Sequence, residues 1–364
     1  MVVPLDWGLG HATRCIPLIR ELLTNGCEVI IAAETATKSL LMLEFQQLTF
    51  IPLKGYRISY SKVKHGLPLK IISQVPRLLL AIYEEHTWLK KVVKKYSINA
   101  IISDNRFGLY HERIPSVYIT HQLLIKTGSS FSEKIAQKIH FWFIKKYTSC
   151  WIPDFEGKNN IAGELSHPAK HPSNIHYIGC LSRFEKKDGI VKKYDLLILV
   201  SGPEPQRTIF EKLLLQQLKN YNGKVLLVRG LPGIDEKEER VLNANEQDAH
   251  LVIKNHLSAR ELNDAIQEAG LVVSRSGYTT IMDLIRLQQR AILVPTPGQT
   301  EQEYLAWHLM KQDFFYASSQ EGFMLTEALK QAEDFPFAVP AFDMEQYKKV
   351  VHQFIKSLPS VMNA

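Results

Sequence analysis

Residues 272–283 have the sequence VVSRSGYTTIMD, which passes from an apolar run through a small polar turn into an amphipathic stretch. The aliphatic start favours a buried strand, Ser276 and Gly277 favour a turn, and the remainder favours the first turns of a helix. A strand followed by a short turn and a helix is the repeating unit of a parallel sheet with crossover helices. This stretch therefore predicts an α/β fold.

The same alternation extends on both sides of this stretch. The carboxyl-terminal half has strand-like runs at 196–200, 224–228, 251–253, 271–273 and 291–294. The amino-terminal half has strand-like runs at 2–5, 28–33, 49–53, 100–103, 116–120, 150–153 and 176–178. Helical patterns occur at 258–268 and 278–287, and another separates the first two strands. Because Pro17 fits only the first turn of a helix, the helix between the first two strands is expected to begin near Thr13.

Two strand series in one chain predict two doubly wound parallel-sheet domains, each resembling a Rossmann fold. Residues 179–193 are polar, charged and without periodicity, so we place the linker there. The predicted domains are residues 1–183 and 184–341, and a final helix is expected at 342–357. A chain of 364 residues is long enough for two such cores.

Composition and charge narrow the class of protein. Hydrophobic residues make up 45% and charged residues 22%, as in globular proteins. The sequence shows no secretory signal pattern and no apolar run of bilayer length, and its four cysteines form no C-x-x-C pair. These features predict a cytoplasmic protein. Residues 1–183 carry a net charge of +10 and the remainder −3, which suits an anionic partner for the amino-terminal half.

Residues 131–146, FSEKIAQKIHFWFIKK, combine lysines with aromatic residues in a helical pattern. Such a helix can lie in a membrane interface, which predicts a peripheral contact with anionic lipid at the inner face of the membrane. The alternative is a helix that packs on the sheet and keeps its lysines in water. Nucleic-acid binding would rest on net charge alone, since no aromatic-basic module is present, and is not predicted.

The turn after the first strand carries the first candidate catalytic residue. Residues 6–14, DWGLGHATR, contain two glycines that allow a tight turn into a helix. The dinucleotide-binding fingerprint G-x-G-x-x-G would need a third glycine where Thr13 stands. Glu34, however, ends the second strand at a spacing that fits the acidic residue of that fingerprint, so a dehydrogenase stays an alternative on spacing alone. His11 follows at the carboxyl edge of the sheet, where an imidazole can act as a base near neutral pH. The alternative role for His11 is helix capping or packing.

Two further base candidates follow other strands. Asp104 ends the strand at 100–103, and His121 follows the strand at 116–120. Carboxyl strand ends meet at one edge of a parallel sheet, so all three side chains are expected there. Each of them could instead organise its loop. The choice among His11, His121 and Asp104 stays open at this point.

Polar turns in the carboxyl-terminal half predict a site for a phosphorylated ligand. Ser274, Ser276 and Gly277 offer hydroxyl and amide groups at a helix start, and Asp283 lies two turns on, where it could accept from a ribose. Arg207 or Arg275 could stabilise a leaving phosphate. The donor-site candidates in these turns are Ser201, Gly202, Arg207, Ser274, Arg275, Ser276, Gly277, Thr279, Asp283, Gln299, Gln302 and Glu303, and Gly10 of the amino-terminal glycine turn is a further candidate.

Together these motifs resemble the inverting GT-B glycosyltransferases, in particular the family 28-like enzymes that add N-acetylglucosamine to the lipid-linked peptidoglycan precursor. Gly8-x-Gly10-His11 is similar to their amino-terminal glycine loop. Residues 274–283 look like their donor signature, with Asp283 where the family has Glu, and 295–304 look like their sugar-reading loop. The resemblance implies two domains with a cleft between them, and a terminal helix (342–364) that returns to the amino-terminal domain.

The resemblance also implies a function. The carboxyl-terminal domain would bind a UDP-sugar, with backbone groups near His256 and Leu257 at the uracil. The amino-terminal domain would hold an acceptor of unknown identity, either lipid-linked or a glycan. A base would activate the acceptor hydroxyl, and attack opposite the leaving diphosphate would invert the anomeric carbon. No D-x-D motif requires a metal, and no cofactor is expected. The alternatives are a nucleotide-sugar hydrolase, an epimerase, or a non-catalytic nucleotide-sugar-binding protein.

Overall fold

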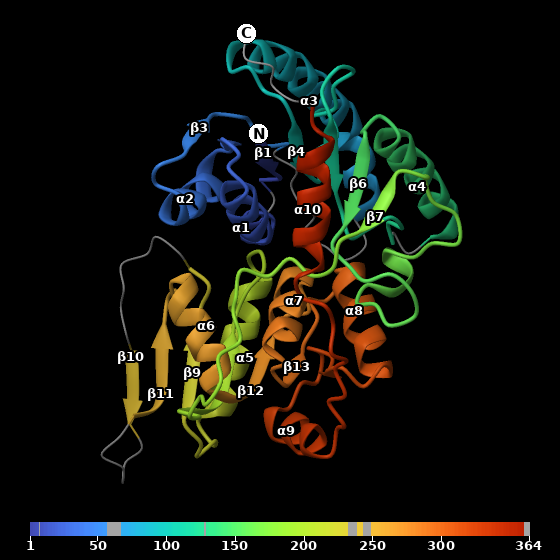
Figure 1. Cartoon of the computed structure of the whole chain (residues 1–364). Helices are drawn as coiled ribbons and strands as arrows, with labels where there is room; N and C mark the ends of the chain where they lie inside the picture. Colours follow the sequence, from blue (N-terminus) through green and yellow to red (C-terminus); the bar gives the residue numbers. More distant parts are fainter. Residues whose placement is uncertain (7, 57–66, 127–128, 232–238, 243–248, 360–364) are drawn as a thin grey trace. The chain divides into compact units, whose positions relative to one another are not determined.

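The computed structural model describes residues 1–6, 8–56, 67–126, 129–231, 239–242 and 249–359. Its residues divide into two compact units (Figure 1). Unit 1 contains Met1–Ser182 together with the segment that begins at Phe342, and unit 2 contains Arg183–Ala341. The chain therefore leaves unit 1 between Ser182 and Arg183 and returns to it at Phe342.

The described residues of unit 1 form a central sheet of seven strands, all of them parallel. The strand order is β3-β2-β1-β4-β5-β6-β7, so the chain builds outward from β1 in one direction and from β4 in the other. A doubly wound parallel sheet was predicted from the sequence, and it is confirmed. The strands are β1 (Val2–Pro4), β2 (Ile30–Ala32), β3 (Thr49–Ile51), β4 (Ile101–Asp104), β5 (Ser116–Ile119), β6 (Ser149–Ile152) and β7 (Ile175–Tyr177).

The helices of unit 1 are α1 (Leu9–Thr24), α2 (Thr35–Glu44), α3 (Leu67–Lys95) and α4 (Ser130–Ile144), which lie between its strands in the chain, and the terminal helix α10 (Gln346–Ser357). A short 3-10 turn, η1 (Gly163–Leu165), lies between β6 and β7. The terminal helix α10, red in Figure 1, packs against α1. The Phe354 ring of α10 also meets Trp151 of β6 edge-on, with ring centroids 5.3 Å apart. These contacts attach the last segment of the chain to unit 1.

The start of α1 corrects one expectation. The helix begins at Leu9 and contains Pro17 in its interior, so the expected start near Thr13 was wrong. Gly8 precedes the helix with a φ of 91°, a conformation that a side chain would strain. Pro17 removes one helical hydrogen bond, but α1 buries Cys15, Ile16 and Leu18 against the unit, and this packing compensates for the lost bond.

The described residues of unit 2 form a second seven-stranded sheet, ordered β10-β11-β9-β8-β12-β13-β14. Six of these strands are parallel, whereas β10 pairs antiparallel with β11. The strand β10 and the two-residue β14 were not predicted from the sequence. The strands are β8 (Tyr194–Leu199), β9 (Val225–Val228), β10 (Glu239–Leu242), β11 (Ala249–Lys254), β12 (Ala269–Ser274), β13 (Ala291–Leu293) and β14 (Tyr316–Ala317); the helices are α5 (Gln206–Leu218), α6 (Ala259–Glu268), α7 (Tyr278–Leu287), α8 (Thr300–Lys311) and α9 (Leu325–Glu333).

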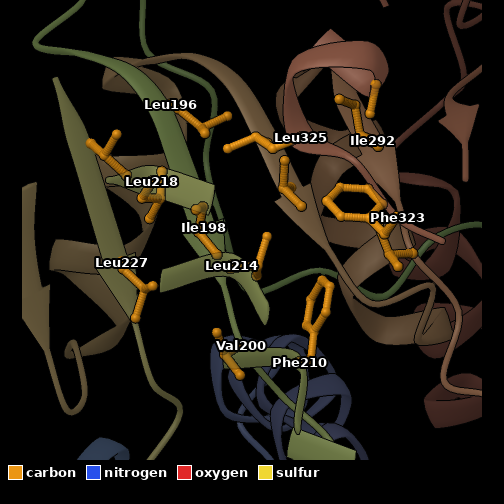
Figure 2. Close-up of a cluster of buried hydrophobic side chains, with 14 of the residues drawn as sticks. Leu196, Ile198, Val200, Phe210, Leu214, Leu218, Leu227, Ile292, Phe323 and Leu325 are labelled. Carbon is orange, nitrogen blue, oxygen red and sulfur yellow. The ribbon is translucent and has the colours of Figure 1, made fainter. Parts of the chain in front are cut away.

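Figure 2 shows the core that holds β8 in place in unit 2. Leu196, Ile198 and Val200 point from β8 and its end toward the side chains of α5, including Phe210 and Leu214. Each such buried side chain contributes about 1.5–3 kcal/mol relative to an exposed one. This packing fixes the position of the carboxyl end of β8, after which a ligand-binding turn was expected.

Candidate functional site

The site in unit 1 lies where the sheet reverses its direction of winding. Strands β1 and β4 are neighbours, and the loops that follow them lead to opposite sides of this point. In open α/β sheets, ligands bind beyond the carboxyl ends of the strands at such a switch point. His11 lies in the first turn of α1 after β1, and Asp104 is the last residue of β4. The structure thus brings together two candidates that are 93 positions apart in the chain.

His11 and Asp104 form a hydrogen-bonded pair. The Nδ1 atom of His11 lies 3.1 Å from Oδ2 of Asp104. The Asp104 side chain is completely buried, whereas the His11 side chain keeps 15% of its surface exposed. Among the residues that the structure describes, none hydrogen-bonds to Nε2 of His11. The partly exposed imidazole therefore has one nitrogen held by a carboxylate and the other available to a ligand.

Arg14 joins this pair to the third candidate. Its Nε donates to Oδ2 of Asp104 at 2.7 Å, and its Nη2 donates to Oδ1 of the same carboxylate. Its Nη1 lies 3.2 Å from Nδ1 of His121, which follows β5. Arg14 is 2% exposed and His121 8%. All three base candidates therefore belong to one buried network, and Arg14 is its centre.

The charges in this network set the protonation states. Burial lowers the pKa of His11, and the positive charge of Arg14 lowers it further. Burial alone would raise the pKa of Asp104, but the charges of Arg14 and His11 outweigh it and lower this pKa to about 2. Asp104 is therefore a carboxylate and His11 a neutral imidazole near pH 7.

The geometry gives the three candidates different roles. Asp104 is buried and both of its oxygens are occupied by donors, so it suits an orienting carboxylate better than a base that meets a substrate. His11 suits the base, because a carboxylate fixes one ring nitrogen and the other is reachable. Arg14 was not predicted from the sequence as a site residue. Its position three residues after His11, which places both side chains on one face of α1, is the sequence feature that could have indicated it.

A second buried pair supports the end of β4. The Nε atom of Arg106 lies 2.5 Å from Oε1 of Glu85 on α3, and the other Glu85 oxygen accepts from the Tyr56 hydroxyl at 2.7 Å. Asn105 adopts a positive φ of 56° between Asp104 and Arg106 and accepts a hydrogen bond from the Tyr118 hydroxyl at 2.7 Å. These bonds fix the backbone that presents Asp104.

Unit 2 has its switch point between β8 and β12, which are adjacent. Ser201 and Gly202 follow β8, and Ser274 to Gly277 end β12 and lead into α7. Gly202 has a φ of 105°, which favours glycine. Gly277 is the N-cap of α7 and supplies no side-chain cap, and the N-terminus of a helix is a favourable place for a negative charge. Thr279 and Asp283 are half-buried further along α7.

The loop between β13 and α8 is tied to this turn. Ser276 Oγ donates to the carbonyl of Gln302 at 2.8 Å. Gln302 donates through Nε2 to Oε1 of Gln299 at 2.7 Å, and Glu303 accepts from the amide of Gly298 at 2.8 Å. The structure therefore brings Ser276, Gln299, Gln302 and Glu303 together, although these side chains also serve to organise the loop. His256 and Leu257 follow β11, another parallel strand, and lie at the same carboxyl edge of the sheet.

The two arginines expected at the leaving phosphate both have partners within the protein. Arg275 is 1% exposed, lies over the Phe210 ring at 4.0 Å and donates to the carbonyls of Val294 and Pro295. Arg207 pairs with Glu204 at 2.7 Å and with Glu211 at 2.6 Å. Both guanidinium groups therefore help to hold loops, and their role at a leaving diphosphate stays a prediction.

Within the described part of the chain, no group of three or more His, Cys, Asp or Glu side chains is arranged to hold a metal ion. None of the described helices has the length and apolar character needed to cross a membrane.

Comparisons with known proteins show what unit 2 is similar to. Residues 206–336 match the model of the glycosyltransferase family 28 C-terminal domain. An uncharacterized glycosyltransferase of Methanosarcina acetivorans is 23% identical over 331 residues, which cover 81% of this chain and 79% of the relative. Another uncharacterized glycosyltransferase, from Methanosarcina mazei, is 21% identical over 327 residues with the same coverage.

Solved structures agree in fold over the whole chain. The glycotransferase of kitacinnamycin superposes with a TM-score of 0.64 at 14% identity and covers 98% of both chains. MurG of Acinetobacter baumannii gives a TM-score of 0.53 at 14% identity, covering 97% of this chain and 98% of its own. The spinosyn rhamnosyltransferase SpnG complexed with thymidine diphosphate gives 0.54 at 14% identity, with coverages of 98% and 96%. These likenesses establish the GT-B fold.

Proposed function

We propose that this chain, a GT-B glycosyltransferase with a family 28-like carboxyl-terminal domain, moves a sugar from a UDP-sugar to an acceptor hydroxyl with inversion at the anomeric carbon. The observation that carries the proposal is the His11–Asp104 pair at the switch point of unit 1. It supplies a base of the kind that activates a hydroxyl. In this proposal the donor binds to unit 2, and the match of residues 206–336 to the glycosyltransferase family 28 C-terminal domain supports that assignment.

In the proposed reaction, Nε2 of His11 takes the proton of the acceptor hydroxyl. The oxygen then forms a bond to the anomeric carbon from the face opposite the diphosphate, and the bond from that carbon to the diphosphate oxygen breaks. Asp104 accepts from Nδ1–H of His11, holds the ring in orientation and stabilises the imidazolium that forms. One displacement of this kind inverts the anomeric configuration.

The donor site belongs to unit 2 in this proposal. The amides at the start of α7, with Ser274 and Gly202, would hold the diphosphate, because a helix N-terminus stabilises the negative charge that develops on it. Asp283 would accept from the ribose hydroxyls, and Gln299, Gln302 and Glu303 would contact the sugar. The sequence contains no D-x-D motif, so the proposal assigns charge stabilisation to the helix rather than to a metal.

A ligand screen by thermal unfolding tests the donor site. At a concentration of 100 Kd, a ligand of the folded state adds about 2.7 kcal/mol of stability, which raises the Tm of a domain of this size by roughly 5–10 °C. We expect UDP and at least one UDP-sugar to give such a shift. Asp283→Ala should lose charge-assisted hydrogen bonds and bind UDP about 10-fold to 100-fold more weakly.

Glu333→Ala is the matched control for this screen, since Glu333 is an exposed carboxylate at the end of α9 in the same unit. It should bind UDP as the wild type does. The UDP assignment is wrong if no uridine nucleotide shifts the Tm, or if thymidine diphosphate stabilises the protein more than UDP. The assignment of Asp283 is wrong if Asp283→Ala keeps the full shift.

We also propose that α4, green in Figure 1, contacts an anionic membrane surface from the cytoplasmic side. One face of α4 packs into unit 1 through His140, Phe143 and Ile144. On the rest of the helix, four apolar side chains are exposed at a spacing that keeps them on one face. These are Phe131, Ile135, Ile139 and Trp142, with exposed fractions of 73%, 44%, 52% and 57%. Exposed Lys134, Lys138 and Lys145 accompany them, and apolar residues flanked by lysines suit anionic lipid.

Vesicle cosedimentation tests this contact. We expect the protein to sediment with vesicles of phosphatidylglycerol and phosphatidylcholine but not with phosphatidylcholine alone, and 1 M salt to reduce binding by screening the lysines. The double variant Phe131→Ser/Ile139→Ser should bind the vesicles at least about tenfold more weakly than the wild type, because it removes apolar area that the membrane would bury. Leu43→Ser, at an exposed apolar position on α2, is the control and should bind normally. Equal binding of the double variant and the control would contradict the contact.

A further inference from the structure

We propose that the hydroxyl of Thr296 donates a hydrogen bond to the diphosphate of the donor, and that this contact makes the site in unit 2 select a diphosphate. The inference deepens the proposed function and rests on it for the class of donor. Thr296 was not among the donor-site candidates predicted from the sequence. All the residues that carry the inference belong to unit 2.

Thr296 lies where the turns after three neighbouring strands approach one another. In the sheet of unit 2, β12 has β8 on one side and β13 on the other. Thr296 follows β13, and Gly202 follows β8. A Cβ atom built on Gly202 would lie 3.8 Å from Oγ1 of Thr296. The turns after the two flanking strands therefore meet beyond the end of β12, on the side of the sheet edge from which the chain enters α7.

The hydroxyl of Thr296 has no hydrogen-bond partner within the described part of the chain. The residue is 2% exposed, and its backbone amide donates to Oε1 of Gln302 at 2.9 Å, which holds the residue in place. A buried hydroxyl of this kind is unfavourable, because it has lost its hydrogen bonds to water and gained none from the protein. Thr296 therefore has an unused donor, and that donor faces Gly202.

Glycines leave room for an anion at these turns. Apart from the residues next to Gly202 in the chain, Oγ1 of Thr296 is the one described heavy atom within 4 Å of the Cβ position of Gly202. A Cβ atom built on Gly277, the N-cap of α7, would meet no described atom within 4 Å. Because residues 201–205 are exposed, a small outward shift of this turn would admit a phosphate to the Thr296 hydroxyl.

Arg275 places an uncompensated positive charge under the same turns. Its guanidinium is 1% exposed and donates to backbone carbonyls just before Thr296 and at the start of α5. Its other partners are the side-chain oxygen of Gln320 and the ring of Phe210, so no described carboxylate neutralises it. Burial lowers the pKa of Arg275 to about 10, and the group keeps its charge near pH 7. A buried cation without a counter-ion favours an anion nearby.

The helix start, the buried cation and the unused hydroxyl favour the same kind of group. The N-terminus of α7 and Arg275 favour negative charge, and the Thr296 hydroxyl requires an acceptor. A diphosphate meets both requirements, because it carries negative charge on oxygens that accept hydrogen bonds. A nucleoside without phosphates carries no such charge. The diphosphate should therefore supply much of the affinity of this site, with Thr296 as the contact that depends on direction.

Ligand-observed NMR titration of the full chain tests this assignment with UDP, thymidine diphosphate, uridine and pyrophosphate as probes. Thr296→Val replaces the hydroxyl by a methyl group of similar size. It should bind UDP and pyrophosphate about 10-fold to 100-fold more weakly, because a hydrogen bond to a charged oxygen is lost, and it should bind uridine as the wild type does. Thr296→Ser keeps the hydroxyl and should bind UDP within about threefold of the wild type.

Thermal unfolding separates a binding role from a structural one. The Tm of Thr296→Val without added nucleotide should equal or exceed that of the wild type, because the change removes a buried hydroxyl that has no partner. If Thr296→Val nevertheless fails to fold, Thr296→Ala gives the same comparison of UDP with uridine. Thr326→Val is the matched control, since Thr326 is an exposed threonine on α9 in the same unit, and it should bind every probe normally.

The inference is overturned if Thr296→Val binds UDP as tightly as the wild type, and the donor site of the proposed function then still stands. It is also overturned if the variant loses uridine as strongly as UDP, since the effect would not come from the phosphates. If the wild type binds thymidine diphosphate or pyrophosphate but not UDP, and Thr296→Val weakens that binding, the UDP assignment fails and Thr296 remains a phosphate ligand. A wild-type protein that binds none of the phosphorylated probes would contradict both.

Discussion

Replacement of His11 by glutamine should lower the rate of sugar transfer by roughly 10²-fold to 10⁴-fold, the usual contribution of a positioned general base. Glutamine is close to histidine in size and can still donate one hydrogen bond to Asp104, but it cannot take a proton from a hydroxyl. The donor site lies in unit 2 in our proposal, so the Kd for UDP should not change. Transfer is measured as UDP release with saturating donor and acceptor.

His176→Gln is the matched control for this variant. His176 is an exposed histidine on β7 of the same unit, remote in sequence from the network around Asp104. It should retain the wild-type rate. If His11→Gln transfers sugar within tenfold of the wild-type rate, His11 is not the base. If the variant loses UDP binding as strongly as it loses transfer, the division of roles between the two units is wrong.

Replacement of Asp104 by asparagine should have two large effects. The first is a loss of transfer of about 10²-fold to 10⁴-fold, because an amide group no longer fixes Nδ1–H of His11 and favours the wrong tautomer. The second is a loss of about 3–5 kcal/mol of folding stability, because the buried Arg14 keeps its charge without a counter-ion. Chemical denaturation measures the second effect, and UDP release below the midpoint measures the first.

Asp154→Asn separates the two effects of this change. Asp154 is also a fully buried carboxylate just after a strand of unit 1, but it accepts from the amides of Phe155, Ile161 and Ala162. This control should lose stability and keep the transfer rate of its folded fraction. An orienting role for Asp104 would be contradicted if the Asp104→Asn protein remained folded and transferred sugar as fast as the Asp154→Asn protein.

The sequence was sufficient for features that depend on periodicity and on strand ends. Alternating apolar runs predicted the two parallel sheets, and the expected helix at 278–287 matches α7 (Tyr278–Leu287). Because polar residues after parallel strands meet at one sheet edge, His11, Asp104 and His121 could be named together as candidates. Their order of importance could not be read from the sequence, because it depends on burial and on which nitrogen or oxygen meets which donor.

Ion pairs and hydrogen bonds between side chains far apart in the sequence cannot be predicted from such patterns. In the sequence, Arg14 has no feature that distinguishes it from other arginines in helices. In the structure it is buried and contacts both Asp104 and His121. Conversely, Arg207 and Arg275 stand beside ligand-binding turns in the sequence, but the fold supplies Glu211 and the backbone carbonyls around Pro295 as their partners. The α3 helix (Leu67–Lys95) was also not predicted, and Pro76 within it interrupts the pattern that favours a helix.

Product analysis of one reaction tests the central claim most directly. The wild-type protein is incubated with the UDP-sugar that best stabilises it, labelled with ¹³C at the anomeric carbon, and with a panel of alkyl glycosides and lipid-linked sugars. Our account predicts that the label moves to an acceptor and that its NMR coupling shows the anomeric configuration opposite to that of the donor. Label found only in free sugar, or in an altered UDP-sugar, would indicate a hydrolase or an epimerase and contradict transfer. A product with retained configuration would contradict the single displacement assisted by His11.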